Sequence, residues 1–110
     1  MIVELRTFEP DYPDLSPLHC YAVIGIEADD LRILNDQGRP YLYPQLLFEV
    51  VDGTEPTDWI TDFGAEGERY AYPVEINSPG FFEDFFDAQS SAVATFWRVI
   101  NQRLSVAALV

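Results

Sequence analysis

A series of short apolar segments separated by tight turns restricts the fold of this chain more than any other feature. These segments are rich in β-branched and aromatic residues, which favour strands, and each is too short for a typical helix. Asn35–Gly38 (NDQG) has the composition of a tight turn. The pattern predicts a small antiparallel sheet or barrel. The expected strands are Ile2–Phe8, Cys20–Glu27, Leu31–Leu34, Tyr41–Tyr43 and Leu47–Val51.

An internal similarity extends this pattern toward the middle of the chain. Asp29–Pro44 aligns with Asp58–Pro73, and both segments share a turn glycine and the sequence Tyr-x-Tyr-Pro. One interpretation is a pair of similar hairpins that present these tyrosines side by side. The other is that two hairpins independently need a glycine in the turn and aromatic residues in the return strand. Both interpretations predict a hairpin over each segment.

The pattern changes to a helical one after the second Tyr-x-Tyr-Pro. Ser78-Pro79-Gly80 has the composition of a helix start, with Ser78 as the N-cap. A short helix would then bury one pair of phenylalanines from Phe81–Phe86 and leave the other pair partly exposed. A second, amphipathic helix is predicted from about Ser90. Its apolar stripe comprises Val93, Phe96, Trp97, Ile100 and Leu104.

These elements predict an α+β fold in a single domain over residues 1–110. Residues from about 1 to 76 would be mainly β and residues from about 78 to 104 helical. The expected architecture is a small antiparallel, partly closed SH3-like β-sheet or barrel with a C-terminal amphipathic helix.

The charge balance restricts the class of partner. The chain has 19 Asp and Glu against 6 Arg and no Lys, so its formal net charge is −13. A field of this sign repels nucleic acid and anionic membrane surfaces, and it attracts basic proteins. We therefore expect a basic protein as the partner, with no direct contact to nucleic acid or to a membrane.

No residue pattern in the chain favours catalysis. His19 and Cys20 are the only residues of their types, and neighbours on a strand point to opposite faces, so they would not form a dyad. Asn35–Gly38 lacks the ligand spacing of a calcium loop. We expect no enzyme activity, no metal and no cofactor. A single cysteine and an N-terminus without signal-peptide features predict a cytoplasmic protein, either a monomer or a small homo-oligomer.

Large rings beside acidic residues are the remaining candidates for function. Interfaces favour aromatic anchors within a charged rim. The alternative is that the rings build the core, and we expect exposure chiefly for Trp59 and one of Phe82 or Phe86. The predicted partner-binding residues are Asp29, Asp30, Asp58, Trp59, Tyr70, Tyr72, Phe82, Glu83 and Asp84.

Several of these motifs carry a family resemblance. The chain from Tyr21 to Asp87 resembles a family of small, acidic, uncharacterised bacterial proteins, and the resemblance brings no known activity with it. The motifs are VIGIEADD (Val23–Asp30), LND (Leu34–Asp36), Tyr43-Pro44, Asp58-Trp59, ERYAYP (Glu68–Pro73) and PGFFED (Pro79–Asp84).

Size and charge favour an inhibitory binding protein. Bacterial immunity proteins and antitoxins are commonly this small and acidic, and an acidic surface would occlude the basic cleft of a toxin with rapid, steered association. The alternative function is an SH3-like adaptor or regulatory module that binds a peptide or a host protein. Its aromatic groove would comprise Tyr41, Tyr43, Trp59, Tyr70 and Tyr72.

Overall fold

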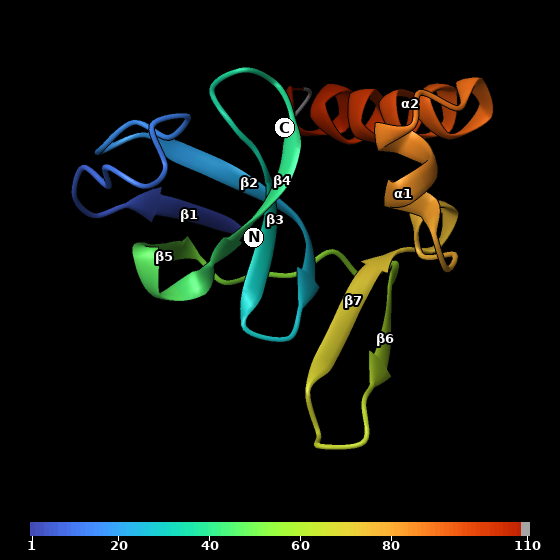
Figure 1. Ribbon diagram of the computed structural model, residues 1–110, viewed down its shortest axis with the longest axis horizontal. Helices are drawn as coiled ribbons and strands as arrows, with labels where there is room; N and C mark the ends of the chain where they lie inside the picture. The colour runs from blue at the N-terminus through green and yellow to red at the C-terminus, as the bar shows by residue number, and fades with distance from the viewer. Residues whose placement is uncertain (109–110) are drawn as a thin grey trace. The chain divides into compact units, whose positions relative to one another are not determined.

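The computed structural model is an α+β protein with an antiparallel sheet followed by helices (Figure 1). It describes the backbone of residues 1–108 and the side chains of residues 1–103. The chain divides into two compact units, one over Met1–Pro73 and one from Val74 onward. The first unit holds the strands β1 (Ile2–Leu5), β2 (Cys20–Glu27), β3 (Asp30–Leu34), β4 (Pro40–Pro44), β5 (Phe48–Asp52), β6 (Trp59–Phe63) and β7 (Arg69–Pro73).

The sheet is organised around β2, the longest strand. β3 pairs with one edge of β2 and β4 pairs with β3, while β1 pairs with the N-terminal part of β2 and β7 with its C-terminal part. The remaining two strands are outermost, because β5 pairs with β1 and β6 pairs with β7. The two ends of the strand path do not pair within residues 1–108, so the sheet is open. The predicted strands are therefore confirmed, except that the first ends at Leu5 and not at Phe8, and the predicted partial closure is not observed.

One face of the sheet forms the hydrophobic core. Alternation along β2 and β3 places Ile26, Leu31 and Ile33 on this face, and the core continues across β4 and β7 through Tyr43 and Ala71. The loop between β1 and β2 adds Leu15, which is buried. Proline at three positions keeps this loop from forming a helix, as its sequence requires.

Hydrogen bonds fasten the β1–β2 loop to the turn between β3 and β4. The Tyr43 hydroxyl donates to the Asp14 carboxylate at 2.8 Å, and the Asn35 amide donates to the same oxygen at 3.1 Å. Asp36 accepts from the hydroxyls of Ser16 at 2.6 Å and Tyr21 at 2.7 Å. The NDQG turn therefore has a second role, because its polar side chains hold a neighbouring loop.

The internal similarity corresponds to two hairpins with the same turn. In each turn a glycine has a positive φ, 72° at Gly38 and 81° at Gly67, and its N–H donates to the residue three positions earlier. The hairpins β3–β4 and β6–β7 lie on opposite sides of β2 rather than next to each other (Figure 1). Their tyrosines also lie on opposite faces, since Tyr43 is in the core and Tyr72 is on the other side of the sheet.

The second unit contains a 3-10 turn, η2 (Val74–Ile76), and the helices α1 (Phe81–Phe86) and α2 (Ser90–Ala108). In α1, Phe81 and Phe85 are buried, Phe82 is half-buried and Phe86 is exposed, which confirms the predicted division of the two pairs. The rings of Phe85 and Phe96 pack with their centroids 4.8 Å apart and thereby join α1 to α2.

Two details of the helical prediction require correction. The N-cap of α1 is Gly80, with a φ of 76°, and not Ser78, because the helix begins at Phe81 and the Gly80 carbonyl accepts its first backbone hydrogen bond, from the N–H of Asp84. The buried stripe of α2 is centred on Ala92, Phe96, Val99 and Ile100, whereas Val93 and Trp97 lie at its half-buried margin. The side chain of Leu104 lies outside the described residues.

Candidate protein-binding surface

The face of the sheet opposite the core carries a row of one residue from each of four strands, three of them acidic and one a tyrosine. Asp30 in β3 pairs with Glu27 in β2, Glu27 pairs with Tyr70 in β7, and Tyr70 pairs with Asp62 in β6. Directly opposed residues on antiparallel strands project from the same face. We call these four residues, together with Asp29 in the β2–β3 turn, the acidic row.

The β2–β3 turn lies beside the start of β7. The backbone N–H of Ala28 donates to the carbonyl of Arg69 at 2.8 Å, and Ala28 itself adopts a left-handed φ of 55°. Asp29 is exposed and its carbonyl accepts from the N–H of Gln45, which fixes the turn to the end of β4. The acidic row is thus held by backbone contacts on both sides of β2.

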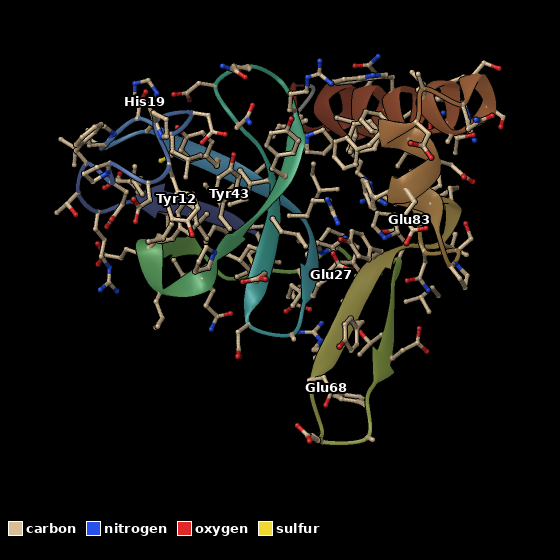
Figure 2. The ribbon with its side chains drawn as sticks, viewed as in Figure 1. Tyr12, His19, Glu27, Tyr43, Glu68 and Glu83 are labelled. Atoms are coloured by element: carbon tan, nitrogen blue, oxygen red, sulfur yellow. The ribbon has the colours of Figure 1, made fainter. Side chains whose placement is uncertain are left out.

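A buried polar network supports the row from the neighbouring positions of the sheet. The Arg32 guanidinium donates to Glu27 at 2.7 Å, to the Tyr72 hydroxyl at 2.7 Å and to the carbonyl of Pro40 at 2.7 Å. Tyr72 in turn donates to Glu27 at 3.0 Å. Figure 2 shows Glu27 on the sheet near β7. Two groups therefore fix the Glu27 carboxylate, and one of them, the Arg32 guanidinium, partly neutralises it.

Burial sets the ionisation of this network. Removal from water raises the pKa of the Tyr72 hydroxyl, and Glu27 raises it further, while the positive charge of Arg32 acts in the opposite direction. The tyrosine therefore stays neutral and remains a hydrogen-bond donor to Glu27.

The net charge of the row comes from its other acidic members. Among residues 1–103, no salt bridge joins Asp29, Asp30 or Asp62 to an arginine, and Asp29 and Asp62 are exposed. Tyr70, which lies between Glu27 and Asp62, is 36% exposed. The surface thus offers carboxylates on either side of an accessible aromatic ring, a combination suited to arginine or lysine side chains.

The β6–β7 hairpin adds apolar area beside the acidic row. Ile60 lies on the same face as Tyr70 and is 42% exposed. Near the turn, Phe63 is 70% exposed, on the other face. The tip of the hairpin, marked by Glu68 in Figure 2, projects away from the other strands of the sheet. The hairpin therefore offers accessible apolar side chains close to unpaired carboxylates.

An ion pair anchors this hairpin. Arg69 at the start of β7 makes a two-pronged contact with the Glu55 carboxylate, with one N–O distance of 2.8 Å. This contact lowers the pKa of Glu55 and raises that of Arg69. Both side chains are about one-third exposed. Arg69 is therefore paired, and the positive charge nearest to the hairpin tip is neutralised.

The structure brings together only part of the predicted partner-binding set. Asp29, Asp30 and Tyr70 share the acidic row. Tyr72 lies on the same face but is only 6% exposed, because its ring covers Gly25 and its hydroxyl joins the Arg32 network. Trp59 lies on the opposite face of β6, where it packs against the core and is half-buried, and Asp58 precedes it at the exposed start of that strand.

The other predicted residues belong to the second unit. Glu83 and Asp84 are exposed in the first turn of α1, where carboxylates complement the helix dipole, and Figure 2 shows Glu83 on this helix. Phe82 is half-buried between Phe81 and Phe86. Phe86 is the more exposed of the two rings that the sequence left as alternatives.

Sequence analysis missed Glu27, Asp62 and Ile60 as members of this surface. Each stands singly in the sequence, and only strand register places them beside Tyr70. A usable signal was present in the second hairpin: its turn matches Asn35–Gly38, so Asp62 could have been paired with Tyr70 by counting outward from Gly67.

The described residues hold no group of three or more His, Cys, Asp or Glu side chains that could bind a metal ion. Across the same part of the chain, no helix has both the length and the apolar character that a membrane crossing requires. Comparison with known proteins adds no further assignment, since no protein-family model, curated protein or solved structure matches the chain. The resemblance to a small acidic bacterial family stays a prediction.

Proposed function

We propose that this chain is an acidic protein-binding protein that inhibits a basic partner, in the manner of an immunity protein or antitoxin, by covering the partner's active cleft. The observation that carries the proposal is the acidic row, in which strand pairing gathers carboxylates from three strands and one turn around the exposed ring of Tyr70 in a fourth strand. Such a surface attracts a basic protein at long range and contacts arginine and lysine side chains at short range.

The rigidity of the row favours binding over mere solubility. Glu27 is fixed by Arg32 and Tyr72, and the β2–β3 turn is fixed by hydrogen bonds to β7 and to the residue after β4. Carboxylates that are already held in place lose less conformational entropy when a partner binds. We further propose that the protein acts in the cytoplasm, as a monomer or small oligomer, without a cofactor.

A pull-down from native host lysate, followed by mass spectrometry, tests the proposal. The protein is immobilised at low salt and the eluates are compared with those at moderate salt. We expect one stoichiometric basic protein that survives moderate salt. A broad set of basic proteins that is lost together as salt rises would contradict a specific partner.

Charge reversal then tests the surface. The double variant Asp29→Lys/Asp62→Lys changes two exposed carboxylates of the row. Its matched control, Asp11→Lys/Glu75→Lys, changes two exposed carboxylates that are not in the row and alters the net charge equally, from −13 to −9 in both cases. We expect the first variant to slow association with the captured partner far more than the control. Equal effects would assign binding to net charge alone.

The SH3-like architecture and the adaptor function remain the second proposal. Short antiparallel strands and tight hairpins support them. Burial of Tyr43 and Tyr72, two of the five rings of the expected groove, weakens the aromatic groove relative to the acidic row.

A further inference from the structure

The outer edge of β5 is a second surface with the properties of a binding site. Within residues 1–108, β5 pairs with β1 alone, so its other edge has backbone N–H and C=O groups without a neighbouring strand. Such an edge is a template for pairing with another chain. The outer strand β4 differs, because Pro40 and Pro44 bound it and proline cannot donate a ladder hydrogen bond.

An apolar pocket of about 260 Å³ lies on the core face of β1 and β5, where Val50 of the edge strand lines it. Its floor comprises Val3, Leu31 and Phe48, which belong to the core. Its rim includes Leu46, which is 87% exposed, and Val50, which is 54% exposed. The core is therefore incompletely covered at β5, and an apolar side chain placed here would be removed from water.

The opposite face of the same strand is acidic. Glu49 in β5 pairs directly with Glu4 in β1, and like charges at opposed positions are unfavourable. A basic side chain on a strand added next to Glu49 would extend this row and relieve the repulsion. Arg6 lies at the pocket on the apolar face, so a basic side chain is disfavoured there. The two faces of the edge thus select different side chains.

We propose that the free edge of β5 binds an extended segment of the basic partner by strand addition. The segment would alternate apolar side chains, which face the pocket, with lysine or arginine side chains, which face Glu49 and Glu4. This inference rests on the proposed function for the identity of the partner, but it concerns a different surface from the acidic row.

Charge disfavours a second copy of this chain as the occupant. Each copy has a net charge of −13. Pairing two β5 strands would bring two such charges together and would add Glu49 and Asp52 of the second copy to an edge that already has both. A basic segment removes this repulsion, whereas a second copy doubles it.

The probe is a synthetic peptide of about eight residues, a usual strand length, that alternates valine with lysine. Its binding to the full chain is followed by NMR through the backbone amides of β5 and through their hydrogen-exchange protection. One control peptide has the same composition with the lysines in a block, and another is N-methylated at every residue so that neither of its edges can donate to a neighbouring strand. We expect only the alternating, unmethylated peptide to shift the amides of Glu49 and Val50 and to protect the amide of Val50, because the N–H of Glu49 faces β1 and that of Val50 faces the free edge.

Conservative variants test each face of the edge. Val50→Thr keeps a β-branched side chain but removes apolar character, and Glu49→Gln removes the charge. We expect each to weaken peptide binding about threefold, the effect of one cross-strand pair. The matched control Glu66→Gln removes an exposed charge at the tip of the β6–β7 hairpin and should leave the affinity unchanged. All three sites are exposed, so the fold is not at risk.

The outcomes separate this inference from the proposed function. Strand addition at β5 would be overturned if the peptide with its lysines in a block bound equally well, or if the shifts were confined to the acidic row. A homodimer that forms through β5 and excludes the peptide would overturn it as well. With the captured partner, weaker binding in Val50→Thr but not in Asp29→Lys/Asp62→Lys would support the edge and contradict the acidic row. Weaker binding in Asp29→Lys/Asp62→Lys but not in Val50→Thr would contradict strand addition at β5 and leave the proposed function supported.

Discussion

At the scale of single residues, Gly25 shows how closely the sheet is packed beneath the acidic row. A Cβ at this position would lie 2.2 Å from one carbon of the Tyr72 ring and 2.8 Å from the carbonyl oxygen of Ala71. The ring is held by hydrogen bonds to Arg32 and Glu27, so it cannot move aside without breaking them. A glycine in the middle of a strand is thus explained by the close approach of a neighbouring side chain.

We predict that Gly25→Ala destabilises the protein by about 3 kcal/mol, at the upper end of the usual cost of overpacking. Urea unfolding measures the change. The matched control is Gly53→Ala, where the nearest side-chain atom is 3.7 Å from the added Cβ, an ordinary contact. That variant should change stability by less than about 1 kcal/mol. Similar effects in the two variants would contradict the packing that the structure shows around Gly25.

Tyr72 gives a prediction with a pH dependence. Tyr72→Phe removes the hydroxyl that joins Arg32 to Glu27, and it leaves the buried Arg32 Nε without this acceptor. We expect a loss of about 1–3 kcal/mol at pH 7, the usual cost of a lost buried hydrogen bond.

The raised pKa of Tyr72 fixes the sign of the pH effect. Because folding favours the neutral hydroxyl, its contribution is complete below the unfolded pKa of about 10 and declines as the pH rises above that value. Urea unfolding between about pH 8 and pH 11 should therefore show a steeper decline for the natural chain than for Y72F. Parallel curves would show that the hydroxyl ionises equally in both states.

At the scale of elements, hairpins and strands could be predicted from the sequence, whereas the register of each hairpin against β2 could not. The sequence indicates both turns: Asn35–Gly38 contains Asx residues and a glycine, and its counterpart contains Gly67. Which face a tyrosine occupies depends on whether its strand pairs with β2 directly or through a neighbour. β7 pairs with β2 itself, whereas β4 reaches it only through β3. Two similar hairpins therefore bury the equivalent tyrosines, Tyr43 and Tyr72, on opposite faces of the sheet, and a local pattern does not contain that information.

The same limit applies to the candidate surface. Adjacent acidic pairs such as Asp29-Asp30 are visible in any sequence, and they were predicted. Glu27 and Asp62 join them only through long-range pairing, because 35 positions separate the two residues in the chain. Tyr72 shows the opposite error, because it was predicted to be on the binding surface but is buried. Gly25 has no side chain, so the Tyr72 ring packs directly against the backbone of the sheet.

The ion pair between Glu55 and Arg69 predicts the behaviour of the β6–β7 hairpin. Glu55→Gln should lower the hydrogen-exchange protection of the hairpin amides at pH 7. The effect on stability should be under about 1 kcal/mol because the pair is partly exposed to solvent. The control Glu66→Gln removes a nearby charge that is not in the pair and should leave protection unchanged.

The lowered pKa of Glu55 gives this effect its pH dependence. The contribution of the carboxylate is present above the unfolded pKa of about 4.3 and is lost as the pH falls through the lower folded value. The difference between the natural chain and the E55Q variant should therefore disappear in strong acid. A difference that persists at that pH would assign the effect to packing of the side chain rather than to its charge.

At the scale of the whole molecule, a net charge of −13 acts on folding and on binding in opposite directions. Carboxylates within each unit repel one another in the folded state, and unfolding separates them. Attraction to a basic partner depends on the same field. Salt screens both interactions, since the screening length falls from about 30 Å at 0.01 M to about 10 Å at 0.1 M.

We therefore predict that added sodium chloride raises the melting temperature of the free protein and lowers its affinity for the captured partner over the same concentration range. Calorimetry measures the first effect, and the association rate measures the second. Sodium chloride is the suitable salt because sulfate would also strengthen apolar burial. The variants Asp29→Lys/Asp62→Lys and Asp11→Lys/Glu75→Lys share a net charge of −9, so both should show a smaller gain in melting temperature. Only the first should also lose much of the salt dependence of association. A melting temperature that falls with salt would show that attractive pairs such as Arg32–Glu27 and Arg69–Glu55 outweigh the repulsion.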